Sequence, residues 1–540
     1  MKINFKDILK NISLIQYTIL LISIVITFVL ADFYNLNKID EARWIKNTVT
    51  DVVQKKIEPN DVCMKNEEIY LNVENINNNF NNSVYIDKLS RTAILTMEDK
   101  SAQFGINSLT SMVNYVSNNL EKPAYIRENN EDYINLKTIT EFYGLYCCLD
   151  SEGNICIYKE LLDAEFTKSY VNFMPLGNEY TLHLNTNSWE IKVILDTAYY
   201  LQDNKYYTII VNNNDRCIIG QVLKKNVDVP IISNTIVPEK GNYSFKSMIV
   251  NNNDLSIDDK VDINLINLIK LGSSDGKINV VNFEKNAEVS AYAIYSNGYS
   301  SYSYDSTITS NMLQNLNSRN YSIQNIINYV VATELDGIVL DFRNLKGSDK
   351  EYFEQYIKEL AALLHSVNRK LMVYVKQDTD YVDINKIINY VDNIIYVTYL
   401  NVSNVPKTAY SIYNIYDIES SLQKLQNIYN VDMSKIILEI PLYSVLWIEK
   451  NSIVTAFELY SLRALQNFLK ENKVTYNIDK VTGLNYAELN KGSLKYKVWI
   501  QDEISIRKNY LLSQKYLLGG IALYKKGYES NYIYNILKGE

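Results

Sequence analysis

An acidic and a basic side chain stand two positions apart in an apolar stretch, residues 336–345, which reads DGIVLDFRNL. Alternate residues of a β-strand point to the same face, so Val339, Asp341 and Arg343 should share one face. A carboxylate can give or take a proton in catalysis, whereas a guanidinium stays charged at any workable pH. The spacing therefore predicts a buried or half-buried ion pair between Asp341 and Arg343, in which each charge compensates the other.

The segment belongs to a regular alternation of strands and helices after residue 240. Short buried strands are predicted over residues 245–250, 263–269, 288–294, 337–342, 370–375, 393–399, 435–440 and 519–524. Amphipathic helices are predicted between several of them, for example over residues 351–368 and 384–390. This pattern predicts an α/β fold, a (β/α)8 TIM barrel over residues 240–540, with any chemistry at the C-terminal ends of the strands.

Residues 336–345 resemble the fourth-strand signature of family 18 glycoside hydrolases, in the form found in bacterial cell-wall and spore-cortex members. That signature reads DG, an apolar residue, Asp or Asn, an apolar residue, then Asp-x-Glu. Further matches follow in the family's order at Ser296-Asn297, 397–399 (VTY), 440–443 (IPLY) with Trp447, 499–505 (WIQDEIS) and 519–524 (GGIALY). The resemblance covers residues 240–535 and implies a chitinase-like barrel.

The family's mechanism implies a role for each of these positions. The acetamido group of the substrate attacks the anomeric carbon, while one enzyme glutamate protonates the leaving oxygen. The resemblance places Arg343 at the position of that glutamate. Leu400 replaces an Asp that contacts the sugar, Val445 stands where an Arg is common, and Tyr524 replaces the Trp under the sugar. The degenerate catalytic positions are Val339, Asp341, Arg343 and Leu400. We therefore expect no intact catalytic set and a pseudoenzyme.

Two other carboxylates could act as the general acid from a different position in the site. Glu439 lies where relatives often have glycine and could approach Arg343 across the barrel. Glu334 precedes the DG pair and is expected to be a solvated residue between a helix and a loop. For Glu439, a structural partner is a stronger interpretation than a catalyst.

Several aromatic side chains at strand ends could still bind sugar. The candidate substrate-binding residues are Asp341, Tyr399, Tyr443, Trp499 and Tyr524. For the four aromatic residues, packing at the barrel mouth is the alternative. His365 is expected on the outer ring of helices. The two histidines and five cysteines lack the spacing of metal ligands, so we expect neither a metal nor a cofactor.

The amino-terminal end predicts a membrane anchor. Residues 12–31 are almost free of charge and long enough to span a bilayer, and three lysines precede them. The positive-inside rule then leaves residues 1–11 in the cytoplasm and the bulk outside, as in a single-pass protein of a Gram-positive-like cell membrane. A cleaved signal peptide is the alternative, although the apolar run exceeds the usual ~7–15 residues. Residues 33–60 read as a polar stalk.

Two small modules are predicted between the stalk and the barrel. Residues 61–160 resemble the α+β module known as the copper amine oxidase N-terminal-like domain, with no metal ligands carried over. Within it, residues 132–144 have an extended start, helical spacing of Leu136, Ile139 and Tyr143, and a stop glycine. Residues 165–230 resemble a bacterial SH3-like domain, with a hairpin over residues 205–220; any small β-barrel is the alternative.

Composition narrows the possible partners. The 540 residues carry a net charge of -8, which argues against nucleic acid as the main partner. The leading hypothesis is a non-hydrolytic, membrane-anchored protein that binds N-acetylglucosamine-containing cell-wall glycan or a wall or spore protein. An active N-acetylglucosamine-directed glycosidase with a relocated acid, acting on peptidoglycan or a chitin-like substrate, is the second. A purely structural assembly component is the third, since this fold hosts many activities.

Overall fold

A computed structural model describes three parts of the chain. The first part is residues 62–144, apart from 67 and 80–83. The second part is the strands within residues 146–251, which are described by their backbone alone. The third part is residues 255–537, apart from 256, 286–288, 301–302, 401 and 403–404. The chain divides into two compact units, residues 1–81 with 128–233, and residues 82–127 with 234–540. The predicted anchor and stalk lie outside the described residues. In the part that is described, no helix has the length and apolar character needed to cross a membrane.

The first unit contains an antiparallel sheet formed by β1 (Val62–Lys65), β2 (Glu68–Asn72) and β9 (Glu131–Asn135). Its helices are α3 (Val73–Asn79) and α4 (Leu136–Tyr143). The side chain of Asn135 caps α4 by accepting from the backbone N–H groups of Lys137 and Thr138, and Gly144 ends the helix with φ of 63°. The predicted extended start, helix and stop glycine are therefore confirmed, with Phe142 rather than Tyr143 on the buried face.

Residues 146–222 are described by their backbone strands. One sheet has the order β11 (Ile155–Tyr158), β10 (Tyr146–Leu149), β18 (Gln221–Val222). A second has the order β13 (Asn172–Met174), β14 (Gly177–Leu184), β12 (Leu162–Phe166), β16 (Tyr206–Val211), β17 (Cys217–Ile219), with β15 (Glu190–Ile194) also paired to β14. The antiparallel pairing of β16 with β17 confirms the predicted hairpin. The side chains here lie outside the described residues, and the SH3-like assignment stays a prediction.

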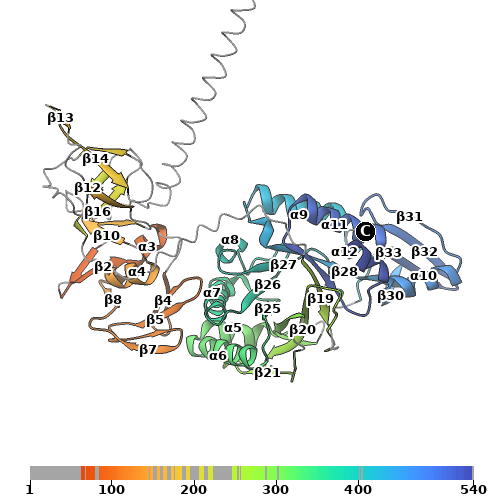
Figure 1. The fold of residues 1–540 in the computed structure, drawn as a ribbon. Coiled ribbons are helices and arrows are strands. Elements are labelled where there is room, and N and C mark those ends of the chain that lie inside the picture. The colour runs from red at the N-terminus through yellow and green to blue at the C-terminus, as the bar shows by residue number, and fades with distance from the viewer. Residues whose placement is uncertain are drawn as a thin grey trace, which may run out of the picture. The chain divides into compact units, whose positions relative to one another are not determined.

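Eight parallel strands of the second unit close into a barrel (Figure 1). In order around the barrel they are β19 (Lys246–Asn251), β20 (Ile263–Leu271), β22 (Ser290–Ser296), β25 (Gly337–Asp341), β26 (Lys370–Lys376), β27 (Asn393–Val397), β28 (Ile436–Pro441) and β34 (Gly520–Tyr524). Closure is complete because β19 pairs with both β20 and β34. All eight predicted strands are present with ends within two residues, so the predicted barrel is confirmed.

Helices cover the outside of the barrel (Figure 1), and the described apolar side chains of its strands and helices form one continuous core. The helices are α5 (Ser306–Gln314), α6 (Leu316–Ala332), α7 (Lys350–Ser366), α8 (Ile384–Ile387), α9 (Ile415–Asn427), α11 (Glu503–Lys515) and α12 (Asn531–Leu537), with 3-10 turns η4 (Gly347–Asp349) and η5 (Met433–Lys435). Strands buried on both faces read as near-continuous apolar runs, which is why the sequence located them. The predicted helix 351–368 is α7, and the predicted helix 384–390 is the shorter α8.

The DG pair that opens β25 has a structural explanation. The carboxylate of Asp336 accepts from the Lys285 ammonium and from the backbone N–H of Ala291, each at 2.8 Å. A Cβ on Gly337 would lie 2.4 Å from the carbonyl oxygen of Lys370 and 2.5 Å from the ring of Tyr292. Only glycine fits between these neighbours, so the DG pair sets the position of the strand that carries Asp341.

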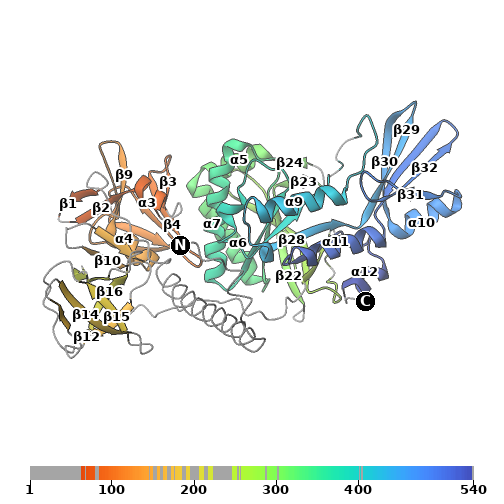
Figure 2. The same cartoon turned by 90° about the horizontal axis from the view of Figure 1, so that it is seen from above.

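An α+β insertion separates β28 from β34 (Figure 2). It consists of β29 (Tyr443–Lys450), β30 (Ile453–Ser461), α10 (Leu462–Glu471), β31 (Tyr476–Ile478), β32 (Asn485–Lys491) and β33 (Leu494–Ile500), with the sheet order β30, β29, β33, β32, β31. Leu446, Leu465 and Val498 help to form a small core of its own. This insertion was not among the predicted elements.

Smaller strands complete the second unit. β21 (Ile278–Val280) adds antiparallel to β20, and β23 (Gly298–Ser300) pairs with β24 (Ser303–Tyr304). A five-stranded antiparallel meander comprises β3 (Val84–Asp87), β4 (Thr92–Thr96), β5 (Ser101–Gly105), β6 (Thr110–Val113) and β7 (Val116–Asn119). The next strand along the chain, β8 (Tyr125–Glu128), is the fourth strand of the sheet of β1, β2 and β9. The five strands β3–β7, here called the meander, fall within residues 61–160 of the sequence but belong to the same compact unit as the barrel.

Candidate functional site

The site predicted at the end of β25 contains a close ion pair. Nε of Arg343 lies 2.5 Å from Oδ1 of Asp341, and the two side chains are 17% and 10% exposed. Asn297, at the end of β22, holds the backbone of Arg343 in place by donating to its carbonyl and accepting from its N–H, both at 3.0 Å. The predicted pairing of Asp341 with Arg343 is confirmed, and the Ser296-Asn297 match has a positioning role.

Two tyrosine rings flank the guanidinium of Arg343. Its Cζ lies 5.5 Å from the ring centroid of Tyr304 and 5.4 Å from that of Tyr374, within the range of cation–π attraction. Burial alone would lower the pKa of Arg343, but the charge and hydrogen bond of Asp341, together with Tyr304 and Glu439, hold the pKa well above the ordinary value. The group is therefore a permanent cation that cannot donate a proton to a leaving group.

Tyr304 and Tyr374 were not among the predicted site residues. A signal for Tyr374 was present in the strand order, because β25 and β26 are neighbours and Leu340 pairs with Val373. The next residues along the two strands are Asp341 and Tyr374. Tyr304 lies in the short hairpin after β22, and no periodic pattern in the sequence marks it.

Glu439 lies on β28 with no exposed surface. Its Oε1 accepts from the hydroxyl of Tyr399 at 2.5 Å. Burial raises the pKa of Glu439, and the charge of Arg343 opposes that rise in part. The charges of Glu439 and Arg343 therefore influence each other, as expected for residues that face each other across the barrel. A carboxyl with a raised pKa has the character of a general acid, but this one is buried and engaged by Tyr399, so a glycosidic oxygen does not reach it in this structure.

The structure brings three of the predicted aromatic residues together. The rings of Tyr399 and Tyr524 are 6.3 Å apart, and those of Tyr443 and Tyr524 are 6.1 Å apart. Tyr399 and Tyr443 are only 1% and 5% exposed, so packing describes their role better than sugar stacking. Tyr524 is half-buried and is the member of this cluster that a ligand could reach.

Trp499 lies in the same sheet as Tyr443, which begins β29, and in a different sheet from Asp341 and Tyr524. It belongs to β33 of the insertion, where its Nε1 donates to Oδ2 of Asp479 at 2.8 Å. Its ring packs against Tyr486 with centroids 4.9 Å apart. These contacts place Trp499 in the packing of the insertion, and its half-buried ring also packs against the barrel core.

The remaining positions are distributed between core and surface. Val339 has no exposed surface and Val445 is 3% exposed, whereas Leu400 is 47% exposed just after β27. Glu334 is exposed in the turn between α6 and β25, as predicted.

Within the described residues, no group of His, Cys, Asp and Glu side chains could hold a metal ion. A separate surface groove of about 270 Å³ between β21 and α6 is lined by Lys277, Ile278, Val280, Tyr321, Asn325 and Tyr329.

His365 lies on α7, on the outer ring of helices as predicted, and contacts two acceptors. Nδ1 is 2.7 Å from the carbonyl oxygen of Glu98, and Nε2 is 2.9 Å from Oδ2 of Asp392. Both contacts are hydrogen bonds only when both ring nitrogens carry protons. The hydrogen bond to Asp392 raises the pKa of His365. The other charged groups near this contact are the side chain of Glu98 and Lys370.

We expect a pH-dependent contribution of His365 to stability. A raised pKa in the folded state means that the stabilisation is fully present below the unfolded pKa and is lost as pH rises through the folded pKa. The difference in thermal midpoint between the wild type and His365→Gln should therefore be larger at about pH 5.5 than at about pH 8.5. His183 is present in both proteins and cancels in the difference. Equal differences at the two pH values would contradict this assignment.

Comparison with known proteins agrees with this barrel and these strand ends. The chain belongs to the glycosyl hydrolases family 18, whose pattern matches residues 241–529. Residues 52–157 match the copper amine oxidase N-terminal domain, as expected for the α+β module.

A curated relative and several solved structures are similar over the barrel. An uncharacterized glycosylase, YvbX, of Bacillus subtilis (strain 168) is 22% identical over 278 residues, which cover 49% of this chain and 78% of the relative. A chitinase from Chromobacterium violaceum ATCC 12472 has 16% identity and a TM-score of 0.49, covering 54% of this chain and 98% of that one. The spore cortex-lytic enzyme SleL of Bacillus cereus has 16% identity and a TM-score of 0.47, covering 54% and 74%.

Proposed function

We propose that this chain is a family 18 protein that binds N-acetylglucosamine-containing cell-wall glycan without hydrolysing it. The observation that carries the proposal is the ion pair between Arg343 and Asp341 at the end of β25. By the resemblance to the family signature, Arg343 stands at the position of the proton donor. Asp341 is the carboxylate that would orient the acetamido group of the substrate. Because that carboxylate is bound to a permanent cation, the site has neither a proton donor for the leaving oxygen nor a free carboxylate to orient the acetamido group.

The proposal includes a location. Residues 12–31 act as an uncleaved anchor, and the body of the protein faces the wall of a Gram-positive-like cell. The copper amine oxidase N-terminal-like and SH3-like modules then lie between the membrane and the barrel along the chain. In support, a related structure is named a spore cortex-lytic enzyme, and a cortex or wall glycan is a ligand that an outward-facing protein can meet.

The test measures hydrolysis and binding in the same samples. Purified full-length protein is incubated with N-acetylglucosamine oligomers and with insoluble peptidoglycan, and released reducing ends and protein retained on the pellet are both measured. We expect no release above the blank and specific retention on peptidoglycan. Tyr524→Ala should reduce retention because Tyr524 is the reachable ring of the tyrosine cluster. Tyr476→Ala, which removes a 53% exposed tyrosine from the insertion, is the matched control.

Two results would contradict the proposal. Released sugar that is abolished by Glu439→Gln would establish an active glycosidase that uses the buried carboxyl of Glu439 as a relocated acid. Neither release nor retention would leave the barrel as a structural component that assembles without a glycan.

A further inference from the structure

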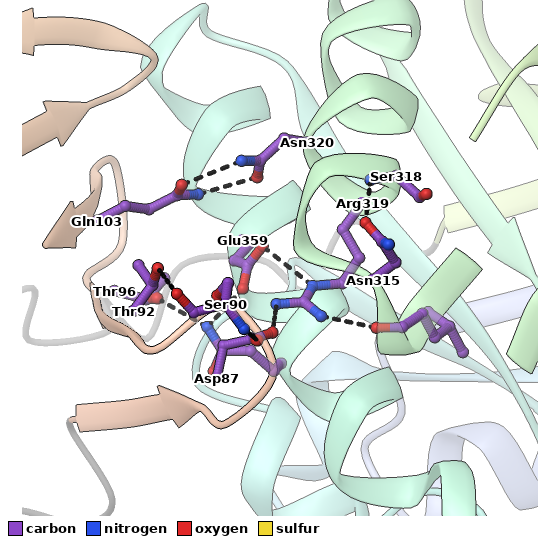
Figure 3. Close-up of polar contacts among 12 residues, drawn as sticks. Asp87, Ser90, Thr92, Thr96, Gln103, Asn315, Ser318, Arg319, Asn320 and Glu359 are labelled. Carbon is purple, nitrogen blue, oxygen red and sulfur yellow. Dashed lines mark hydrogen bonds and ion pairs between the residues drawn. The ribbon is translucent and has the colours of Figure 1, made fainter. Parts of the chain in front are cut away.

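Polar side chains occupy a buried face of the barrel's helices. Arg319 and Asn320 lie on α6, and Gln355 and Glu359 lie one turn apart on α7. All four are buried, Arg319 with no exposed surface and Glu359 with 1%. Helices of an outer ring normally present such residues to water. What covers this face of α6 and α7 is the meander of the same compact unit (Figure 3).

Arg319 is the centre of this contact. Its Nη2 donates to Oδ2 of Asp87, at the end of β3, at 3.0 Å, and its Nη1 donates to the carbonyl of Leu313 at 2.7 Å. Its Nε lies 3.6 Å from Oε2 of Glu359. Figure 3 shows the guanidinium between Asp87 of the meander and Glu359 of α7. Asp87 is itself 1% exposed, so the pair that joins the two segments is removed from water.

Hydrogen bonds between uncharged side chains surround the ion pairs of Arg319. Gln103 on β5 and Asn320 on α6 exchange two amide hydrogen bonds, of 2.9 and 3.0 Å (Figure 3). The hydroxyl of Tyr115 also donates to Asn320, at 3.3 Å. Gln355 on α7 donates to Thr96 on β4 at 3.4 Å. The partners therefore come from several strands of the meander, and each of these hydrogen bonds joins a donor on one side of the contact to an acceptor on the other.

The energetics of buried charges indicate that the contact between the meander and α6–α7 is specific. A charge is costly to bury unless it is paired, and removal of one partner of a buried pair costs more than the pair contributes. Burial would lower the pKa of Arg319, but Glu359, Tyr85 and Asp87 together raise it, so the group is charged where it lies. Burial raises the pKa of Glu359. Without the meander, this face would lose Asp87, one of the two carboxylates that Arg319 contacts.

We propose that the α6–α7 face of the barrel is a specific docking surface for the meander of the same chain, with Arg319 as its anchor. The functional barrel domain of this protein then includes residues 82–127 as well as the barrel, although those residues lie within the match to the copper amine oxidase N-terminal domain. The partner that this surface fits is an antiparallel sheet that presents one carboxylate and a side-chain amide. The proposal is independent of glycan binding.

Hydrogen–deuterium exchange of the full-length protein tests the proposal. Arg319→Met removes the anchor and leaves Asp87 and Glu359 without their cation, while Asp87→Ala removes the partner from the meander alone. In either variant, we expect amide exchange in residues 92–105 to accelerate about tenfold or more, because opening of this segment no longer breaks the buried pair. Lys495→Met, which breaks a half-exposed ion pair with Glu488 in the insertion, is the matched control and should leave the meander unchanged.

The double variant sharpens the result. If Arg319 and Asp87 act through each other, the combined change should accelerate exchange less than the product of the two single effects. If Arg319→Met does not fold, Asp87→Ala still tests the docking of the meander, because it alters only the meander's side of the contact. Exchange within twofold of the wild type in Asp87→Ala would overturn the proposal, as would equal acceleration in every peptide of the second unit.

Discussion

Replacement of Arg343 by Glu, the residue that the family signature carries at this point, is expected to lower the free energy of unfolding by about 3–5 kcal/mol. The change removes the cation that compensates Asp341 at 2.5 Å and puts a second carboxylate beside it. Glu439 adds a third acidic group to the same electrostatic environment. On the proposed function no hydrolysis should appear, because the resemblance to the family also places Leu400 and Tyr524 at the positions of a sugar-contacting Asp and Trp.

The control for this prediction is Arg343→Lys, which keeps a cation near Asp341. It should lower the free energy of unfolding clearly less than Arg343→Glu does. Stability is measured by chemical denaturation at about pH 7 and about pH 5. Carboxyls crowded by like charges have raised pKa values, so the Glu variant should recover part of its loss at the lower pH. A Glu variant as stable as the wild type would contradict the compensating role of Arg343, and released sugar would contradict the view that the barrel has lost more than one group.

The sequence located the barrel because its strands are buried on both faces. Such strands must be apolar along their whole length, which leaves a local signal in every one of them. It also located Asp341 and Arg343, since the alternation around them is strict and their spacing fixes a common face. The ion pair followed from elementary charge compensation and needed no knowledge of the rest of the fold.

The features that were missed depend on contacts between distant segments. Tyr304 reaches Arg343 from a short hairpin, and Asp87 reaches Arg319 across a separation of 232 residues. Neither position has a periodic neighbourhood that would mark it. Trp499 shows how little a matched position says about a role, because its match to the family suggested a sugar contact, whereas its side chain contacts Asp479 and Tyr486 of the insertion. An aromatic residue at a matched position defines a place in the fold, and its exposure decides whether a ligand can use it.

Trp447→Ala should cost about 3–5 kcal/mol of stability. Trp447 has no exposed surface, and its ring packs against Tyr410 and Phe457 with centroids 4.9 and 5.8 Å away. Its Nε1 also donates to the carbonyl of Tyr410 at 2.8 Å, so the residue joins the insertion to the segment after β27.

Trp447→Phe separates the two contributions of this side chain, because it keeps an apolar ring but leaves the carbonyl of Tyr410 without its donor, at a cost of about 1–3 kcal/mol. Ile453→Ala, at a 56% exposed position of the same sheet, is the control. Denaturation followed by circular dichroism gives the order of the three variants. An Ala variant no less stable than the Phe variant would mean that the ring packing contributes little, and the matched tryptophan would then matter for its hydrogen bond alone.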